Sequence, residues 1–496
     1  MKKRFYSTVF VFTFSIFAFG MNGAIAQDQT FDLAILNGRV MDPETGLDAI
    51  RSIGIRDGVI IAIEEDTLLG EITIDASGLI VAPGFIDIHT HGMNDESNRL
   101  AVADGVTTAL ELEVGVYPVA SWYAEQEGLY FTNYGASVGH IPTRMKLKHD
   151  IDIGSWMTAP ADDNIQDLAP AYAFEAADDA EIARLQSLIR EGIEDGALGI
   201  GMGVTYTPAA TRREILSIFR SSAEMHAPIF IHMRSTDNKE KLEPLNEVIS
   251  NVAVTGASVH VVHINSSGLD DAPLMVQMIR DANQRGLDIS TETYPYNASS
   301  TRLESALYSG DWEARSGQQF SSLMWVETGE RLNAETFRQY REIGGFIVDY
   351  SQKEENIRWL VSQPDVIIGS DGIPFVDGRA HPRGAGTFSR VLGKYVREEN
   401  LLSLMAALRK MTILPAQRLE TIAPDMLRKG RVQVGADADI TIFNAETIID
   451  HATFLKPAQP SSGIMHVIIN GVLVIRDSIL DDSVHPGRPI LGASTE

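Results

Sequence analysis

The chain has 496 residues, with 41 Lys and Arg against 67 Asp and Glu, so its formal net charge is −26. This acidity argues against nucleic acid or an anionic membrane surface as a partner, because phosphate binding needs clustered Lys and Arg. The sequence contains no cysteine, which excludes disulfides, thiolate metal ligands and a cysteine nucleophile.

The first 26 residues have the pattern of a signal peptide. A basic start at Lys2–Arg4 precedes an apolar run over residues 9–19, and small residues follow at Ala24 and Ala26. The apolar run is too short to hold the chain in a bilayer as a stable anchor. We therefore predict cleavage after Ala26, export to a bacterial periplasm, and no membrane anchor.

Both ends of the remaining chain consist of short apolar runs joined by tight turns. Asn37-Gly38 and Asp57-Gly58 separate such runs near the N-terminus, and Asn470-Gly471 does the same near the C-terminus. Asn-Gly and Asp-Gly between apolar runs are typical of antiparallel hairpins. We predict a small β-sandwich built from residues 27–83 and 426–496.

The middle of the chain, residues 84–425, alternates apolar strands with helical segments, and this order predicts a parallel sheet. The strand candidates are Phe85–Ile88, Thr108–Leu112, Ala136–His140, Gly199–Val204, Ile229–His232, Val259–Ile264, Asp288–Thr293 and Val366–Ile368. Eight strands over this length fit an α/β fold of the (β/α)8 TIM-like barrel type with insertions. In that architecture the reactive groups lie at the C-terminal ends of the strands.

Histidines and one carboxylate occupy those ends. His89 and His91 close the first strand, and alternate residues of a strand point to one face, so both imidazoles can converge. His232 and His263 end two later strands, and Asp371 follows the last strand. Each histidine alone would be read as structural, but together they predict a metal centre at the mouth of the barrel.

This constellation resembles the amidohydrolase superfamily. Three further segments, Thr293–Tyr296, His381–Gly393 and Gly435–Ile440, are similar to the D-aminoacylase branch, which deacylates N-acyl-D-amino acids. The resemblance covers nearly all of the chain after residue 26. It implies a metal-dependent hydrolase acting on carbon–nitrogen bonds other than peptide bonds, with an N-acyl-D-amino acid as substrate.

The second strand departs from that branch, which usually supplies a metal-binding cysteine there. Alternation along residues 105–115 turns Ala109, Glu111 and Glu113 to one face, so both glutamates should point into the barrel. Glu113 lies nearer the C-terminal end, where its carboxylate can replace the thiolate and bridge two metals. Glu111 remains an alternative ligand, and an ion pair with arginine is the structural alternative. A second departure is Asn265, where close D-aminoacylases tend to carry lysine.

We predict a divalent metal held by His89, His91, Glu113, His232 and His263. Zinc fits this set of nitrogen and oxygen ligands best, and manganese, iron and cobalt are alternatives. Whether one ion or two ions bind stays open. The metal activates a water, and Asp371 accepts its proton as general base and then passes one to the departing amine.

Substrate-binding candidates lie near the strand ends. They are Tyr206, Arg234, Tyr294, Arg379 and Arg383. The arginines can bind a substrate carboxylate through paired hydrogen bonds, with surface ion pairing as the alternative, and the tyrosines can line the pocket, with plain packing as the alternative. Of the other histidines, His140 is a candidate for supporting the site, whereas His260 has no convergent partner in the sequence and is expected to be structural.

Two other functions stay open. The same centre can act on a cyclic amide, a dipeptide or a lactone, or the chain can be a metal-containing binding protein without catalysis, against which the position of Asp371 argues. We expect a small-molecule substrate and no nucleic acid partner, and the sequence leaves a homo-oligomer open.

Overall fold

The computed structural model describes residues 30–158, 171–234 and 241–493. The predicted signal peptide lies outside these residues, so its cleavage and the export of the chain stay predictions. Among the helices of the described ranges, none combines the length and the hydropathy that crossing a membrane requires.

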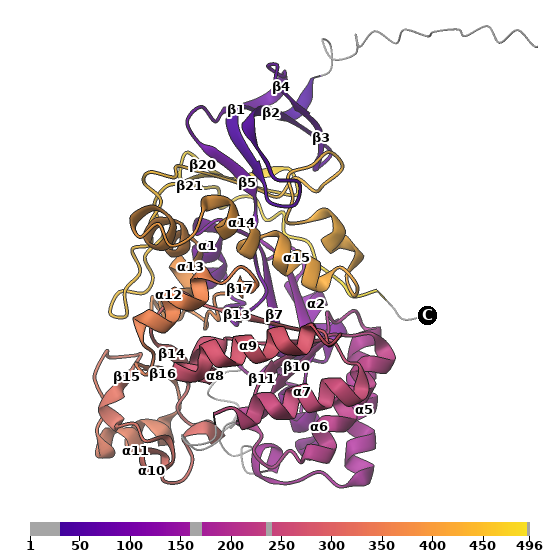
Figure 1. The fold of residues 1–496 in the computed structure, drawn as a ribbon, viewed down its shortest axis with the longest axis vertical. Helices are drawn as coiled ribbons and strands as arrows, with labels where there is room; N and C mark the ends of the chain where they lie inside the picture. The colour runs from indigo at the N-terminus through magenta and orange to yellow at the C-terminus, as the bar shows by residue number, and fades with distance from the viewer. Residues whose placement is uncertain (1–29, 159–170, 235–240, 494–496) are drawn as a thin grey trace, which may run out of the picture.

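Eight parallel strands form the predicted barrel (Figure 1). In order of pairing they are β6 (Phe85–Asp87), β7 (Val106–Tyr117), β8 (Asn133–Gly139), β10 (Ile200–Gly203), β11 (Ile229–His232), β12 (Val259–Val261), β13 (Ile289–Thr293) and β17 (Val366–Ile368). A parallel bridge between Thr90 and Gly372 joins the chain just after β6 to the chain just after β17. The prediction of a TIM-like barrel is confirmed, and each predicted strand overlaps an observed one.

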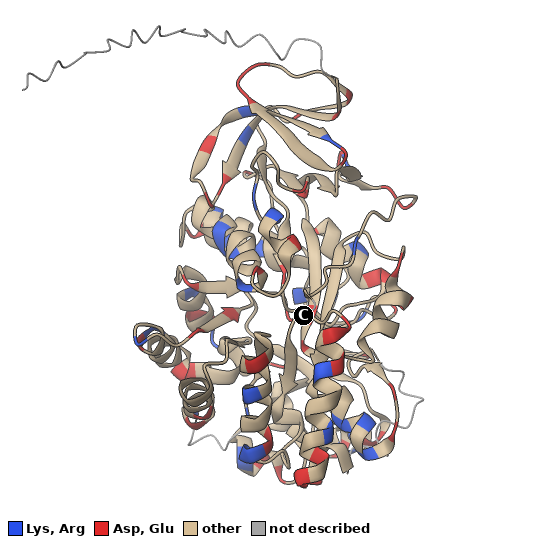
Figure 2. Ribbon diagram, turned by 90° about the vertical axis from the view of Figure 1, so that its right-hand side faces the viewer, with Lys and Arg blue, Asp and Glu red and all other residues tan. Residues whose placement is uncertain are grey.

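Helices pack around the outside of these strands. They include α1 (Asp95–Ala103), α2 (Val119–Gln126), α3 (His140–His149), α5 (Asp179–Glu194), α6 (Arg212–Met225), α7 (Glu243–Thr255), α9 (Ala272–Asn283), α12 (Glu354–Ser362), α13 (Arg383–Arg390), α14 (Leu404–Met411) and α15 (Ile413–Leu419). Helix α5 shows why such segments form: Asp178 caps its first turn, and Ile182, Leu185 and Ile189 recur at helical spacing on its buried face. Both Lys or Arg and Asp or Glu residues occur along the outer helices (Figure 2).

Strands from both termini form a second, mixed sheet beside the barrel. Its order is β21 (Ile479–Leu480), β20 (Val472–Arg476), β19 (Ile464–Ile469), β18 (Ile440–Phe443), β5 (Ile80–Pro83), β1 (Phe31–Asp42), β2 (Leu47–Arg56) and β3 (Val59–Glu64), with β4 (Gly70–Asp75) also paired to β1. The two chain ends meet where β18 pairs antiparallel with β5. Ile35 and Ile53 of the N-terminal part share one apolar core with Ile442 and Ile468 of the C-terminal part. The predicted joint contribution of both termini is confirmed.

An insertion between β13 and β17 builds a third, three-stranded antiparallel sheet. Its strands are β14 (Ser299–Arg302), β16 (Phe346–Asp349) and β15 (Leu323–Trp325), in that order, accompanied by α10 (Trp312–Ser316) and α11 (Ala334–Ile343). Trp312, Trp325 and Phe337 belong to its own apolar core. The insertion flanks the barrel mouth, so it supplies one wall of the functional site.

Candidate metal centre

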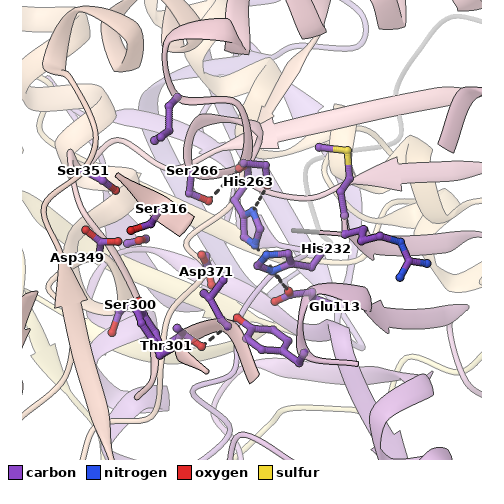
Figure 3. A pocket seen from close by; sticks show the side chains of 18 of the residues that line it. Glu113, His232, His263, Ser266, Ser300, Thr301, Ser316, Asp349, Ser351 and Asp371 are labelled. Atoms are coloured by element: carbon purple, nitrogen blue, oxygen red, sulfur yellow. Dashed lines mark hydrogen bonds and ion pairs between the residues drawn. The ribbon is translucent and has the colours of Figure 1, made fainter. Parts of the chain in front are cut away.

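Six buried or nearly buried side chains converge at the C-terminal end of the barrel. His89 and His91 follow β6, Glu113 lies on β7, His232 ends β11, His263 follows β12, and Asp371 follows β17. Parallel strands that end at one rim bring residues distant in sequence together. Figure 3 shows Glu113, His232, His263 and Asp371 side by side at the edge of a cavity.

Glu113 lies at the centre of this group, between two sets of histidines. Its Oε2 atom is 3.0 Å from Nε2 of His89 and 3.0 Å from Nε2 of His91. Its Oε1 atom is 2.7 Å from Nδ1 of His232 and 3.6 Å from Nε2 of His263. One carboxylate is thus shared by two donor groups, the geometry expected of a ligand that bridges two cations.

The donor atoms fit divalent cations. One group joins His89, His91, Glu113 and Asp371, the other joins Glu113, His232 and His263, and the donor atoms of each lie within 4.8 Å of one another. Asp371 Oδ1 is 3.4 Å from His89 Nε2 and 3.5 Å from His91 Nε2. Ligands about 2.0–2.1 Å from a tetrahedral zinc ion stand about 3.3 Å apart, close to these separations.

The charges of the centre favour a cation. Burial raises the pKa of Glu113, but hydrogen bonds from His232 and His263 outweigh burial and hold that pKa well below its ordinary value. Burial lowers the pKa of His91, but the carboxylates of Glu111 and Asp371 raise it well above its ordinary value. The centre therefore keeps its carboxylates ionised and draws positive charge among them, the role a divalent metal fills.

Two further carboxylates hold the first histidine pair. Glu111 Oε2 is 2.8 Å from His91 Nδ1, and its other oxygen accepts weaker hydrogen bonds from backbone amides that follow on β7. Glu292, on β13, contacts His89 Nδ1 and lies 3.1 Å from His260 Nε2. Such contacts leave the Nε2 atoms of His89 and His91 free to face the metal position. The two glutamates of β7 thus divide their tasks: Glu113 faces the donor atoms, and Glu111 supports a ring.

Two histidines outside the converging group, His260 and His140, have carboxylate partners of their own. The expectation that His260 has no convergent partner is wrong, because Glu292 joins it to His89. The sequence analysis missed Glu292, although alternation along β13 turns it to the opposite face from its neighbours Thr291 and Thr293. His140 lies at the start of α3, and its Nε2 is 2.8 Å from Glu214, which Arg144 also binds, so its hydrogen bond is to this separate ion pair.

Two of the converging residues have left-handed backbone conformations. His263 has a φ angle of 31° and Asp371 one of 52°, values that residues with a side chain rarely adopt. The backbone amide of Asp371 donates to the carbonyl of His89 at 2.7 Å, which ties the turn after β17 to the turn after β6. Strain of this kind is typical of functional sites, where it aims a side chain.

Comparison with known proteins supports this interpretation of the centre. The family model "Amidohydrolase family" matches residues 80–474. The chain belongs to the amidohydrolase family. It is 29% identical to a D-aminoacylase of Alcaligenes xylosoxydans xylosoxydans, over 93% of this chain and 98% of the relative, and 29% identical to an N-acyl-D-glutamate deacylase of the same organism, over 93% and 96%.

A solved structure gives the same result. The N-acyl-D-glutamate deacylase of Bordetella bronchiseptica, solved with zinc and a phosphonate inhibitor, matches with a TM-score of 0.77 at 25% identity, over 93% of this chain and 100% of that one. The chain is therefore a hydrolase acting on carbon–nitrogen bonds, with a buried His, Glu and Asp cluster that can hold metal.

The structure separates the two predicted tyrosines of the amidohydrolase. Tyr206 lines the cavity beside the metal ligands, with its ring against His232 and its hydroxyl 2.9 Å from Thr301 Oγ1. Tyr294 is buried, and its hydroxyl accepts a hydrogen bond from Gln352 Nε2 at 2.7 Å. Gln352 in turn accepts from Asn265, so Asn265 is part of a buried polar chain.

The three predicted arginines lie in three different environments. Arg383 is fully buried, with Nη1 2.8 Å from Asp371 Oδ2. Arg234 lines the cavity, but Glu247 binds its guanidinium through two hydrogen bonds of 3.0 and 3.2 Å. Arg379 is exposed and lines a separate surface cavity. Of the three, the structure brings Arg383 to the predicted base and leaves Arg379 outside the site.

The amidohydrolase centre opens into one cavity of about 160 Å³. Glu113, Tyr206, His263 and Asp371 of the barrel line it, together with Thr301 and Asp349 of the insertion. The cavity therefore places a small ligand in contact with the metal position and with the insertion at once.

Proposed function

We propose that this amidohydrolase cleaves the amide bond of N-acyl-D-amino acids, releasing a carboxylate and a free amino acid. The relatives named above support the substrate class. The observation that carries the proposal is Asp371, which stands beside both the first histidine pair and the cavity. A carboxylate beside the metal ligands and open to the cavity stands where hydrolysis needs a proton acceptor.

Zinc fits the residues present, held by His89, His91, Glu113, His232 and His263. When bound, a divalent metal supplies an activated water and positive charge for the oxygen of the scissile carbonyl. Glu113 would be the shared ligand, because each of its oxygens faces a different histidine pair.

Asp371 acts as general base and then as general acid. Burial raises its pKa, but Arg383 and His89 outweigh burial and lower that pKa, so the carboxylate is ionised at neutral pH and can accept a proton. Arg383 holds Oδ2, which leaves Oδ1 to face the metal ligands. The proton taken there is passed to the leaving amine when the amide bond breaks.

The test is amine release from paired N-acetyl-D- and N-acetyl-L-amino acids after reconstitution with zinc. We expect turnover of the D-series, and Asp371→Asn should keep its zinc while kcat falls by about 10²–10⁴-fold. Hydrolysis of dihydropyrimidine-type cyclic amides, dipeptides or lactones, with no amine release from the D-series, would move the substrate to those classes. Unchanged turnover in Asp371→Asn would remove it as the base.

A further inference from the structure

Asp349 is a buried carboxylate on the wall of the cavity opposite the metal ligands. It is the last residue of β16, where the backbone is paired with Ser299 of β14 on one side and Leu323 of β15 on the other. Its exposed fraction is 8%, and it lines the same cavity as Glu113 and Asp371 (Figure 3). The carboxylate is thus fixed by a sheet and aimed at the space a ligand would fill.

The partners of this carboxylate are neutral. Ser351 forms a side-chain hydrogen bond with it, and Gln318, in the amide orientation that satisfies both groups, donates to its two oxygens at 3.1 and 3.3 Å. Within residues 30–158, 171–234 and 241–493, no Lys, Arg or His nitrogen comes within 4.0 Å of it. Burial raises its pKa to about 7, although Ser351, Ser322 and the more distant charges of Lys241 and Arg331 oppose burial.

A buried carboxylate without a cation is costly, and an incoming cation offsets that cost. We propose that Asp349 is a recognition site for a cationic group of the substrate, so that the preferred substrates are N-acyl amino acids with a basic side chain. The proposal rests on the function proposed above. Asp349 and Asp371 line one small cavity, so a ligand whose scissile amide is at the metal ligands can reach both.

Two basic residues, Arg315 and Lys241, line the same cavity, and they could instead favour a substrate with an acidic side chain. Arg315 donates to the backbone carbonyl of Leu307, which holds its guanidinium in the insertion. Burial lowers the pKa of Lys241, against the pull of Asp271 and Asp349, so its ammonium charge is disfavoured there. If these cations rather than Asp349 set the preference, an acidic side chain would be favoured and Lys241 would carry that preference.

The first measurement compares kcat/KM for N-acetyl-D-lysine, its neutral isostere N-acetyl-D-norleucine, and N-acetyl-D-glutamate. We expect the wild-type ratio of lysine to norleucine to be at least tenfold, and Asp349→Asn to lower that ratio by at least tenfold. In Lys241→Met, the matched control on the same wall, the ratio should stay at or above its wild-type value. A wild-type preference for glutamate or norleucine overturns the proposal, as does a ratio that Asp349→Asn leaves unchanged.

A binding measurement separates this proposal from the function on which it rests. In zinc-loaded Asp371→Asn protein, calorimetry should show N-acetyl-D-lysine binding at least tenfold more tightly than N-acetyl-D-norleucine, and the additional change Asp349→Asn should abolish the difference. Absence of turnover for every N-acyl-D-amino acid would refute the proposed function, whereas equal binding of the two ligands would refute the Asp349 site. If Asp349→Asn does not fold, the lysine preference of the single Asp371→Asn protein decides alone.

Discussion

Glu113 is the residue on which the centre depends most. Both of its oxygens face histidines, so its loss removes a ligand from both donor groups at once. Glu111, two residues earlier on the same strand and equally buried, contacts one histidine from behind. Because Glu113 and Glu111 lie on the same strand, substitutions at the two positions compare a metal ligand with a residue that only supports a ligand.

We expect Glu113→Gln to lower zinc affinity by more than about 100-fold and to abolish turnover, because a neutral amide cannot serve two cations. Glu111→Gln should cost about 10–100-fold in affinity and leave zinc bound at saturating concentration. Zinc content by mass spectrometry and zinc-dependent thermal stabilisation measure both effects. Equal zinc content and activity in Glu113→Gln and wild type would show that Glu113 is not a ligand.

At the scale of elements, Lys410 joins two helices outside the site. It lies near the end of α14, its exposed fraction is 1%, and its Nζ donates to the carbonyls of Leu360 and Val361 at the end of α12. Burial lowers its pKa from 10.5 to about 7, with a smaller opposing effect of Asp365. Burial therefore favours the neutral amine in the folded chain, and a neutral amine still carries two N–H groups that can donate to both carbonyls.

This pKa predicts a pH dependence of stability. Between about pH 7 and 10.5 the unfolded chain keeps the Lys410 proton and the folded chain releases it, so the free energy of unfolding rises with pH. From pH 7.5 to 9.5 wild type should gain up to about 2 kcal/mol over Lys410→Met, since one pH unit is worth about 1.4 kcal/mol. Denaturant unfolding at both pH values measures this. Parallel pH profiles of the two proteins would mean that Lys410 titrates normally.

At the scale of the whole molecule, Asp439 connects the barrel to the terminal sheet. Its carboxylate accepts hydrogen bonds from Asn133 at the start of β8, at 3.0 Å, and from the backbone of Asn470 after β19, at 2.7 Å. Lys429, with an exposed fraction of 3%, lies 2.7 Å from the same carboxylate and 3.0 Å from Asp437. A buried ion pair thus sits where the two sheets meet.

Removing one partner of that pair should destabilise the molecule as a whole. Lys429→Met leaves a buried carboxylate unpaired, so we expect a loss of about 3–5 kcal/mol in the free energy of unfolding. The neighbouring Arg428, half exposed and paired with Asp425 and Asp437, is the control, and Arg428→Met should cost less than about 1 kcal/mol. Denaturant unfolding with zinc content as a second readout measures both. Equal losses in the two variants would contradict a special role for the buried pair.

The site was predictable as far as strand geometry determines it. Alternation turns His89 and His91 to one side and Glu111 and Glu113 to one side, and the ends of parallel strands meet at one rim. Arg379 and Arg383 show the limit: they are four residues apart and chemically identical, yet one is exposed and the other is buried against Asp371. Nothing local separates them, because burial depends on what packs over each.

Short-range periodicity and strand polarity were enough to predict the barrel, the joining of both chain ends in one sheet, and the histidines and carboxylates that converge at the barrel mouth. The folded structure was needed to show that Glu113 faces both histidine pairs, that Glu292 links His260 to His89, and that Asp349 of the insertion lines the same cavity as Asp371. Those relations join residues from separate segments, and their distances are set by packing.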